Sequence, residues 1–175
     1  MIEVYQKAIK VQPNYAKAYN NLGNVFKEIG EQKKAKNFYE KAINIQPNYA
    51  NTHYNLGLIL RELGENKKAI TSYQKAIEIN PDHTSSYNNL GNLFKELGEY
   101  KRAINCYQKS IQIKPDYADT HYNFGLVFQA FGEFQKAVAS YQKAIDINPD
   151  HTSAYNNLGI VLRELGEDQK AINSY

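Results

Sequence analysis

The hydrophobic and polar positions of the chain follow a helical period from Asn14 onward. At about 100° per residue, residues 14–29 would form a helix with an apolar arc and a polar arc. The apolar arc contains Ala18, Tyr19, Leu22, Gly23, Val25, Phe26 and Ile29, and the polar arc contains Lys17, Asn20, Asn21, Asn24, Lys27 and Glu28. A second helical segment runs from Glu31 to about Ile45. Because no segment alternates with the period of two typical of strands, the pattern predicts a hairpin of two helices.

Local signals mark the ends of both helices. Gly30 can adopt the left-handed conformation that ends a helix, and Pro47 disfavours helical geometry in the residue before it. Asparagine and aspartate are preferred N-cap residues. We therefore expect the first helix of each hairpin to be capped by Asn14, Asn48, Asp82, Asp116 and Asp150.

The same hairpin pattern returns every 34 residues along the chain. The step is kept by a proline series, two glycine series and a tyrosine series: Pro13, Pro47, Pro81, Pro115 and Pro149; Gly23, Gly57, Gly91, Gly125 and Gly159; Gly30, Gly64, Gly98, Gly132 and Gly166; Tyr5, Tyr39, Tyr73, Tyr107, Tyr141 and Tyr175. A strict period of this length is typical of repeat proteins, in which each unit contacts its neighbours. The predicted organisation is a single array, with part of a repeat at 1–15, complete repeats at 16–49, 50–83, 84–117 and 118–151, and a truncated repeat at 152–175.

Composition narrows the class of protein. The net charge of +3 is too small to predict nucleic-acid binding, for which a domain with clustered basic residues is expected. Cys106 is the single cysteine, which excludes an intrachain disulfide and favours a reducing compartment. No apolar run approaches the length of a membrane span, and the first residues lack a signal-peptide pattern. We expect a soluble, cytoplasmic protein with neither a nucleic acid nor a membrane as partner.

Each unit carries eight residue types at fixed positions, which in the first complete unit are Tyr19, Leu22, Gly23, Phe26, Ala35, Tyr39, Ala42 and Pro47. This set resembles the tetratricopeptide repeat (TPR) family, and the resemblance covers the whole chain. His53 and His121 replace the first aromatic residue, and Ser110 replaces the second alanine, where we expect a looser contact. The resemblance implies an all-α fold: a right-handed α-solenoid of stacked helix-turn-helix (TPR) hairpins. It also implies that the first helices line a concave groove that binds extended peptides.

One position on the first helices is asparagine in every unit, and we call it the asparagine series: Asn21, Asn55, Asn89, Asn123 and Asn157. A carboxamide donates and accepts, so it can bind the C=O and N–H groups of a peptide whatever its side chains are. The series resembles the asparagine ladder in the TPR superhelix of O-linked N-acetylglucosamine transferase. The alternative is structural, because an asparagine could instead bond to the neighbouring helix and fix the stacking of the units.

The residues around the series repeat with a period of 68, because polar and apolar pairs alternate along the groove. The pairs are Asn20 and Asn24, Tyr54 and Leu58, Asn88 and Asn92, and Tyr122 and Leu126. Lys27, Arg61 and Lys95 place a cation on the same face of three units. We count Asn20, Asn24, Tyr54, Asn88, Asn92, Tyr122 and these cations as candidate peptide contacts. The banding has an alternative origin, which is a duplication without any role in recognition.

Other signals are weaker. A basic ribbon follows the second helices, at Lys34, Lys41, Lys68, Lys75, Arg102, Lys109, Lys136 and Lys143, and a solvated face is its usual explanation. The histidines recur with the repeat and form no cluster that would hold a metal. The sequence contains no nucleophile elbow, phosphate loop or dinucleotide fingerprint. We therefore expect no enzymatic activity, no metal and no cofactor.

Two classes of function remain. The first is a protein–protein interaction scaffold that binds an extended peptide or protein partner in the groove. The second is a self-associating module that stacks head to tail through exposed terminal repeats into a homo-oligomer, since repeat arrays normally need a polar capping repeat. A fragment of a larger protein, such as the TPR part of an enzyme, would explain the same ends.

Overall fold

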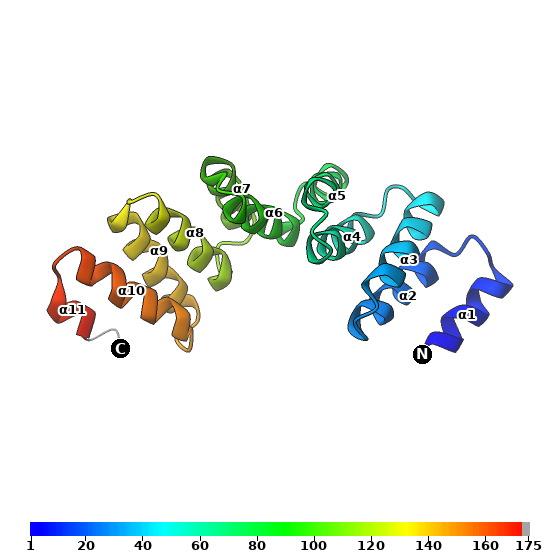
Figure 1. Cartoon of the computed structure of the whole chain (residues 1–175), viewed down its shortest axis with the longest axis horizontal. Helices are drawn as coiled ribbons and strands as arrows, with labels where there is room; N and C mark the ends of the chain where they lie inside the picture. Colours follow the sequence, from blue (N-terminus) through cyan, green and yellow to red (C-terminus); the bar gives the residue numbers. More distant parts are fainter. Residues whose placement is uncertain (173–175) are drawn as a thin grey trace. The chain divides into compact units, whose positions relative to one another are not determined.

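Helices are the only regular secondary structure in the computed structural model of the chain, which describes residues 1–172 (Figure 1). In chain order they are α1 (Ile2–Val11), α2 (Ala16–Glu28), α3 (Gln32–Ile45), α4 (Ala50–Glu62), α5 (Asn66–Ile79), α6 (Thr84–Glu96), α7 (Tyr100–Ile113), α8 (Ala118–Ala130), α9 (Phe134–Ile147), α10 (Thr152–Glu164) and α11 (Asp168–Ile172). Tyr175, the last member of the tyrosine series, lies outside the described residues. The predicted all-α fold of helix hairpins is confirmed.

The chain divides into two compact units, residues 1–89 and 90–175, with the boundary inside α6. In unit 1, α1 packs on α2, the hairpin of α2 and α3 packs on α4, and α4 pairs with α5. In unit 2, α7 packs on α8, α8 pairs with α9, and α9 packs on α10, which contacts α11. Each unit is therefore a stack of helix hairpins, the architecture of an α-solenoid. None of the described helices has the length and apolarity needed to cross a membrane.

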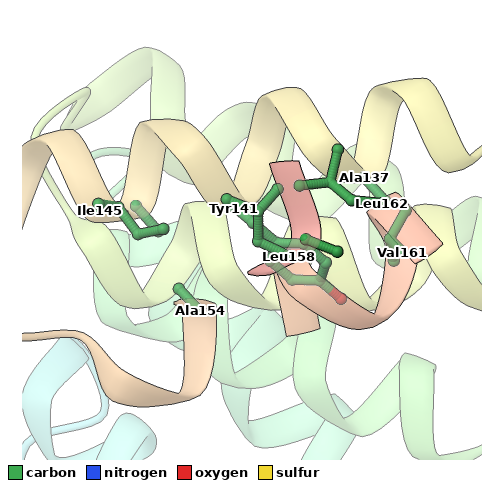
Figure 2. Packing of buried hydrophobic residues seen from close by; sticks show 9 residues of the cluster. Ala137, Tyr141, Ile145, Ala154, Leu158, Val161 and Leu162 are labelled. Carbon is green, nitrogen blue, oxygen red and sulfur yellow. The ribbon is translucent and has the colours of Figure 1, made fainter. Parts of the chain in front are cut away.

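Within each unit, the core lies between the paired helices of a hairpin and between the hairpins that pack on one another. Figure 2 shows it in unit 2, where Tyr141 and Ala137 of α9 lie against Leu158 and Val161 of α10. Tyr141 is completely buried. A buried aromatic side chain removes 150–250 Å² from water, so the tyrosine series supplies a large share of the apolar burial.

The small residues of the hairpin let its two helices approach closely. Gly23 of α2 faces the ring of Tyr39 of α3, and a Cβ atom at Gly23 would lie 2.5 Å from the ring carbon Cε1 of Tyr39. The same pairing recurs in the hairpins that contain Tyr73, Tyr107 and Tyr141. Glycine is required there because no side chain fits between the helix and the ring.

On the C-terminal side, α3 ends at Ile45 as predicted, whereas α2 ends at Glu28, one residue before the predicted Ile29. Gly30 has φ of +77°, which is the left-handed conformation expected of a residue that stops a helix. Ile29 was predicted to face the core, but it is 58% exposed. The reason is that α2 ends at Glu28, so Ile29 belongs to the cap and no longer follows the helical period.

The predicted N-caps are wrong by one residue. Asn14 lies in a turn in which the N–H of Tyr15 donates to the C=O of Gln12 at 3.1 Å, and the helix begins only at Ala16. The cap position is therefore the residue after each predicted one: Tyr15, Tyr49, His83, Tyr117 and His151. The tyrosines make no capping hydrogen bond through their side chains, whereas the two histidines do.

Ser110 does not loosen its contact, contrary to expectation. It is completely buried, and its hydroxyl lies 3.2 Å from that of Thr120, also completely buried, on the next helix. A buried hydroxyl without a partner would cost about 1–3 kcal/mol. The pairing of the two hydroxyls removes that cost and joins α7 to α8.

Candidate peptide-binding surface

The asparagine series lies on the first helix of every hairpin. Its members are Asn21 on α2, Asn55 on α4, Asn89 on α6, Asn123 on α8 and Asn157 on α10. All five side chains are half-buried. They therefore touch both the protein and the solvent, as residues that bind a ligand and residues that fix helix stacking would both do.

In unit 1, Asn55 is held by the first helix of the preceding hairpin. Its Nδ2 donates to Oδ1 of Asn24 at 3.1 Å and to Oδ1 of Asn20 at 3.5 Å. Thr52 also donates to Asn20 Oδ1, at 3.0 Å, and the hydroxyl of Tyr39 donates to Asn24 Oδ1 at 2.8 Å. The side chains of α2, α3 and α4 thus form one polar cluster around Asn55.

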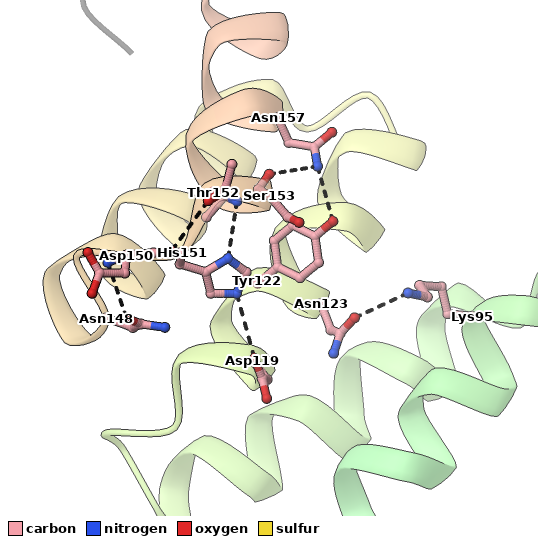
Figure 3. A network of polar contacts seen from close by, with 11 residues as sticks. Lys95, Asp119, Tyr122, Asn123, Asn148, Asp150, His151, Thr152, Ser153 and Asn157 are labelled. Atoms are coloured by element: carbon pink, nitrogen blue, oxygen red, sulfur yellow. Dashed lines mark hydrogen bonds and ion pairs between the residues drawn. The ribbon is translucent and has the colours of Figure 1, made fainter. Parts of the chain in front are cut away.

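In the next repeat a tyrosine holds the asparagine of the series, and this arrangement returns after 68 residues. Asn89 Nδ2 donates to the hydroxyl oxygen of Tyr54 at 3.3 Å, and Asn157 Nδ2 donates to that of Tyr122 at 3.1 Å (Figure 3). In each case the same Nδ2 also donates, at 3.0 Å, to the backbone carbonyl four residues earlier in its own helix. These two asparagines therefore have one orientation in both units.

The remaining two members of the series are held through their oxygen. Lys95 Nζ donates to Asn123 Oδ1 at 3.3 Å, as Figure 3 shows. Asn21 Oδ1 accepts from Asn20 Nδ2 at 3.5 Å. Their amide nitrogens consequently point away from these contacts.

Each member of the series thus has one amide atom held by the chain and one that no described residue bonds to. The unpaired atom is Oδ1 in Asn55, Asn89 and Asn157, and Nδ2 in Asn21 and Asn123. None of these unpaired atoms is buried in the described part of the chain. The surface accordingly presents fixed acceptors and fixed donors to the solvent.

Two of the other candidate contacts are not accessible. Asn20 is 4% exposed and Asn88 is 6% exposed, so little of either side chain is available to a ligand in this structure. The projection of one isolated helix overestimates its polar arc, because the next hairpin covers part of that arc. Asn20 instead joins α2 to α4 by accepting from Thr52.

The other candidates remain half-buried on the first helices: Asn24, Tyr54, Asn92, Tyr122, Lys27, Arg61 and Lys95. Asn92 resembles Asn24, because its Oδ1 accepts the hydroxyl of the tyrosine behind it, Tyr107, at 2.7 Å. The period of 68 is therefore visible in the contacts as well as in the sequence.

Sequence reasoning gave no role to the histidines that replace aromatic residues. His53 Nε2 donates to the carbonyl oxygen of Pro47 at 2.7 Å, and His121 Nε2 donates to that of Pro115 at 2.8 Å. Both rings are almost completely buried. They tie the loop before the helix to the helix itself, a role that only their occurrence 68 residues apart could have suggested.

Six of the eight cations in the basic ribbon contact an acidic or aromatic neighbour, and Lys109 donates to the neutral Gln112. Lys34 lies 3.3 Å from Glu31 and its ammonium lies 5.6 Å from the ring centroid of Phe26. Arg102 similarly contacts Glu99, at 2.5 Å, and its guanidinium lies 3.8 Å from the ring centroid of Phe94. These contacts explain the cations as parts of a solvated helix face.

Burial controls the titrating groups of the core. It raises the pKa of the Cys106 thiol to about 11, so this cysteine stays protonated at neutral pH. It also raises the pKa of Tyr39 and of Tyr141. Neither the cysteine nor these tyrosines is suited to act as a nucleophile or base near pH 7.

Comparison with known families and structures agrees with the fold of stacked helix hairpins. The family model described as TPR repeat matches residues 2–30, 23–60, 57–98, 91–132 and 130–166. The chain belongs to the TPR family. No curated protein sequence matches the chain at a significant level.

The same architecture occurs in solved TPR structures. The crystal structure of MamA protein has 28% sequence identity and a TM-score of 0.82, over 91% of this chain and 87% of that one. PilF of Pseudomonas aeruginosa has 25% identity and a TM-score of 0.84, over 91% of this chain and 73% of PilF. YrrB shares the fold, with 22% identity and a TM-score of 0.82 over 99% of this chain and 90% of YrrB. The TPR fold is typical of protein–protein interaction.

Proposed function

We propose that this TPR chain is a non-enzymatic interaction scaffold that binds extended peptide segments along its first helices through the asparagine series. The observation that carries the proposal is the way in which the chain holds the side-chain amide of every asparagine in the series. One amide atom is fixed by the chain, and the other is unpaired and not buried.

A fixed carboxamide is a better binding group than a free one. Ordering a mobile side chain at an interface costs about 0.5–1.5 kcal/mol, and the contacts with the preceding hairpin have already met that cost. The unpaired Oδ1 of Asn55, Asn89 and Asn157 suits a peptide N–H, and the unpaired Nδ2 of Asn21 and Asn123 suits a peptide C=O. The structural role and the binding role of the series thus use different atoms of the same side chains.

The class of ligand has further support. YrrB, whose fold the chain shares, is described as a TPR protein with an unusual peptide-binding site, and that site is a property of YrrB. In this chain the proposed contacts are all with backbone groups, which favours an extended segment of broad sequence rather than one defined motif.

The test replaces only the binding atom. In Asn123→Asp the oxygen that accepts from Lys95 is retained, while the Nδ2 donor is lost and a carboxylate faces the peptide carbonyl. We expect about tenfold weaker binding of an unstructured library of peptides of about 12 residues, measured by fluorescence anisotropy. Asn105→Asp, at an exposed position of α7, makes the same charge change away from the asparagine series, and this variant should bind the peptides normally.

Circular dichroism and urea unfolding should show that both variants keep the fold of the native chain. Equal binding by the native chain and Asn123→Asp would refute the proposed contact. Failure of the native chain to bind any peptide of the library would refute the proposed function.

A further inference from the structure

The two units contain the same arrangement of a histidine, a tyrosine and an asparagine of the series. In unit 1 the ring of His83 lies 5.1 Å from that of Tyr54, whose hydroxyl accepts from Asn89. In unit 2 the ring of His151 lies 4.8 Å from that of Tyr122, whose hydroxyl accepts from Asn157 (Figure 3). In each unit, a histidine ring thus packs against the tyrosine whose hydroxyl accepts from the asparagine.

Both histidines also cap the helix that carries the asparagine. Nδ1 of His83 accepts from the N–H of Ser86 at 3.2 Å, and Nδ1 of His151 accepts from the N–H of Ala154 at 3.2 Å. A nitrogen that accepts carries no proton, so the ring proton of each histidine lies on Nε2. This contact requires the neutral imidazole.

The two arrangements differ in what Nε2 faces. Nε2 of His83 donates to Oδ1 of Asn51 at 3.1 Å, whereas Nε2 of His151 lies 3.6 Å from a carboxylate oxygen of Asp119. The Nε2 atom of His151 is itself buried. The ring of His83 therefore faces a neutral amide at Nε2, and the ring of His151 faces a carboxylate.

We propose that His83 and His151 are positioning residues, which set the orientation of Asn89 and Asn157 through Tyr54 and Tyr122 and make peptide binding at these asparagines depend on pH. The inference rests on the proposed function of the asparagine series for its consequence in binding. Its structural part, the link from histidine to asparagine, holds without any ligand.

Protonation of either ring removes the acceptor at Nδ1, so the backbone N–H loses its partner and is repelled by the ring. At His83 the hydroxyl of Ser86, which lies 3.0 Å from Nδ1, can accept from the charged ring, so we expect the larger movement at His151. The tyrosine packed on the ring then moves as well, and with it the hydroxyl that holds Nδ2 of the asparagine. Loss of one such hydrogen bond should change the equilibrium of peptide binding at the asparagine by a factor of about ten. Burial lowers the pKa of His83, which places its response at lower pH.

The groups around each ring are few. His151 faces Asp119 and Tyr122 of α8, with Tyr141 of α9 behind Tyr122 and Asp150 in the preceding turn. The corresponding groups around His83 are Asn51 and Tyr54 of α4, Tyr73 of α5 and Asp82, and the hydroxyl of Ser86 also lies 3.0 Å from Nδ1 of His83. Asp119 in place of Asn51 is therefore the one difference in charge between the two arrangements.

The chain provides internal controls. Asn21 and Asn123 belong to the same series, but Asn20 and Lys95 hold them, and no histidine lies in either contact. Their side-chain amides should not respond to the titration of a histidine. The responding pair, Asn89 and Asn157, and the control pair, Asn21 and Asn123, can be observed in one sample.

The first test is a ¹⁵N NMR titration of the free chain from about pH 8 to about pH 5, which brackets the usual range of histidine. We expect the side-chain amide signals of Asn89 and Asn157 to move with the His83 and His151 rings, and those of Asn21 and Asn123 to stay constant. A titrating His151 ring beside an unchanged Asn157 signal would overturn the proposal.

The matched variants exchange the one difference in charge between the two arrangements. Asp119→Asn, at an exposed position, replaces the carboxylate at Nε2 of His151 by an amide, and Asn51→Asp makes the reverse change at His83, so the pH range of the Asn157 response and that of the Asn89 response should each change with its own variant. In His151→Gln the Asn157 signal should become independent of pH, while Asn89 still responds. An Asn157 signal that responds over the same pH range in Asp119→Asn, although the His151 ring has shifted, would refute the link.

Peptide binding then separates the two proposals. If the native chain binds library peptides about tenfold more weakly near pH 5 and Asp119→Asn displaces this dependence, both proposals are supported. If the amide signals respond as expected but no peptide binds at any pH, the positioning by histidine holds and the proposed function fails. Binding that is independent of pH, with responding amides, would refute the coupling to the ligand.

Discussion

Replacing Gly23 with alanine would place a methyl group against the ring of Tyr39. The new Cβ would lie 2.5 Å from Cε1 and 2.6 Å from Cδ1 of the ring, where carbon atoms normally stay about 3.5–4.0 Å apart. Tyr39 is 0% exposed and its hydroxyl is bonded to Asn24, so the ring has nowhere to move without losing that bond.

Two destabilising contributions and one stabilising contribution decide how far Gly23→Ala changes the free energy of unfolding. Overpacking costs about 1–3 kcal/mol, and loss of the bond between Tyr39 and Asn24 costs about 1 kcal/mol more. Alanine in a helix regains about 1 kcal/mol relative to glycine. We expect Gly23→Ala to lower the free energy of unfolding by about 2 kcal/mol, measured from urea curves followed by circular dichroism.

The control removes the ring. In a Tyr39→Leu background the methyl group meets no aromatic carbon, so Gly23→Ala should stabilise the chain by up to about 1 kcal/mol, with the sign reversed. Gly30→Ala provides a second comparison, because no atom lies within 4 Å of its Cβ but its φ of +77° is strained for alanine. It should cost about 1–2 kcal/mol in both backgrounds. Equal destabilisation by Gly23→Ala with and without Tyr39 would refute the steric explanation.

Three further predictions concern titration and packing. His53→Leu removes the 2.7 Å bond to the loop and should lower the free energy of unfolding by about 1 kcal/mol in thermal unfolding, whereas His53→Gln, which still donates, should lose less. Hydrogen bonds from Lys36 and then Lys68 hold the pKa of the Glu65 carboxyl below its usual value. The stabilisation from Glu65 is therefore present above the unfolded value of about 4.3 and is lost as the pH falls through the folded value, so Glu65→Gln should differ from the native chain in urea unfolding at pH 7 and converge with it in strong acid. Because burial raises the pKa of Cys106 to about 11, its thiol should react with a disulfide reagent far more slowly in the native chain than in the unfolded chain, and equal rates would contradict its burial.

The sequence predicted the helix hairpins because their signals are local. The 3.6-residue period of apolar positions, Gly30 at the end of α2 and Pro47 after α3 each act within a few residues of the chain. The close approach at Gly23 could also be inferred, since a glycine inside a helix is otherwise unfavourable. The N-cap failed by one residue because the turn at Pro13 includes Asn14, and turn geometry is not visible in the residue type alone.

The candidate surface was only partly predictable. The asparagine series is evident from its repetition, but which amide atom is held depends on residues about 35 positions earlier, such as Tyr54 for Asn89 and Asn20 for Asn55. The burial of Asn20 likewise depends on where Thr52 of the next hairpin comes to lie. These contacts arise between hairpins, so no property of one helix could reveal them.

The repeat, the two helices of each hairpin and the recurring residues thus follow from the amino-acid sequence alone, because periodicity and backbone preferences are local properties. The packing of the hairpins decides which recurring residues are buried, which amide atoms of the asparagine series bond to the chain, and that His83 and His151 pack against the tyrosines that hold Asn89 and Asn157. The physical reason is that hydrogen bonds and burial depend on the register between stacked hairpins, which side-chain packing sets through many small contacts rather than through any single motif.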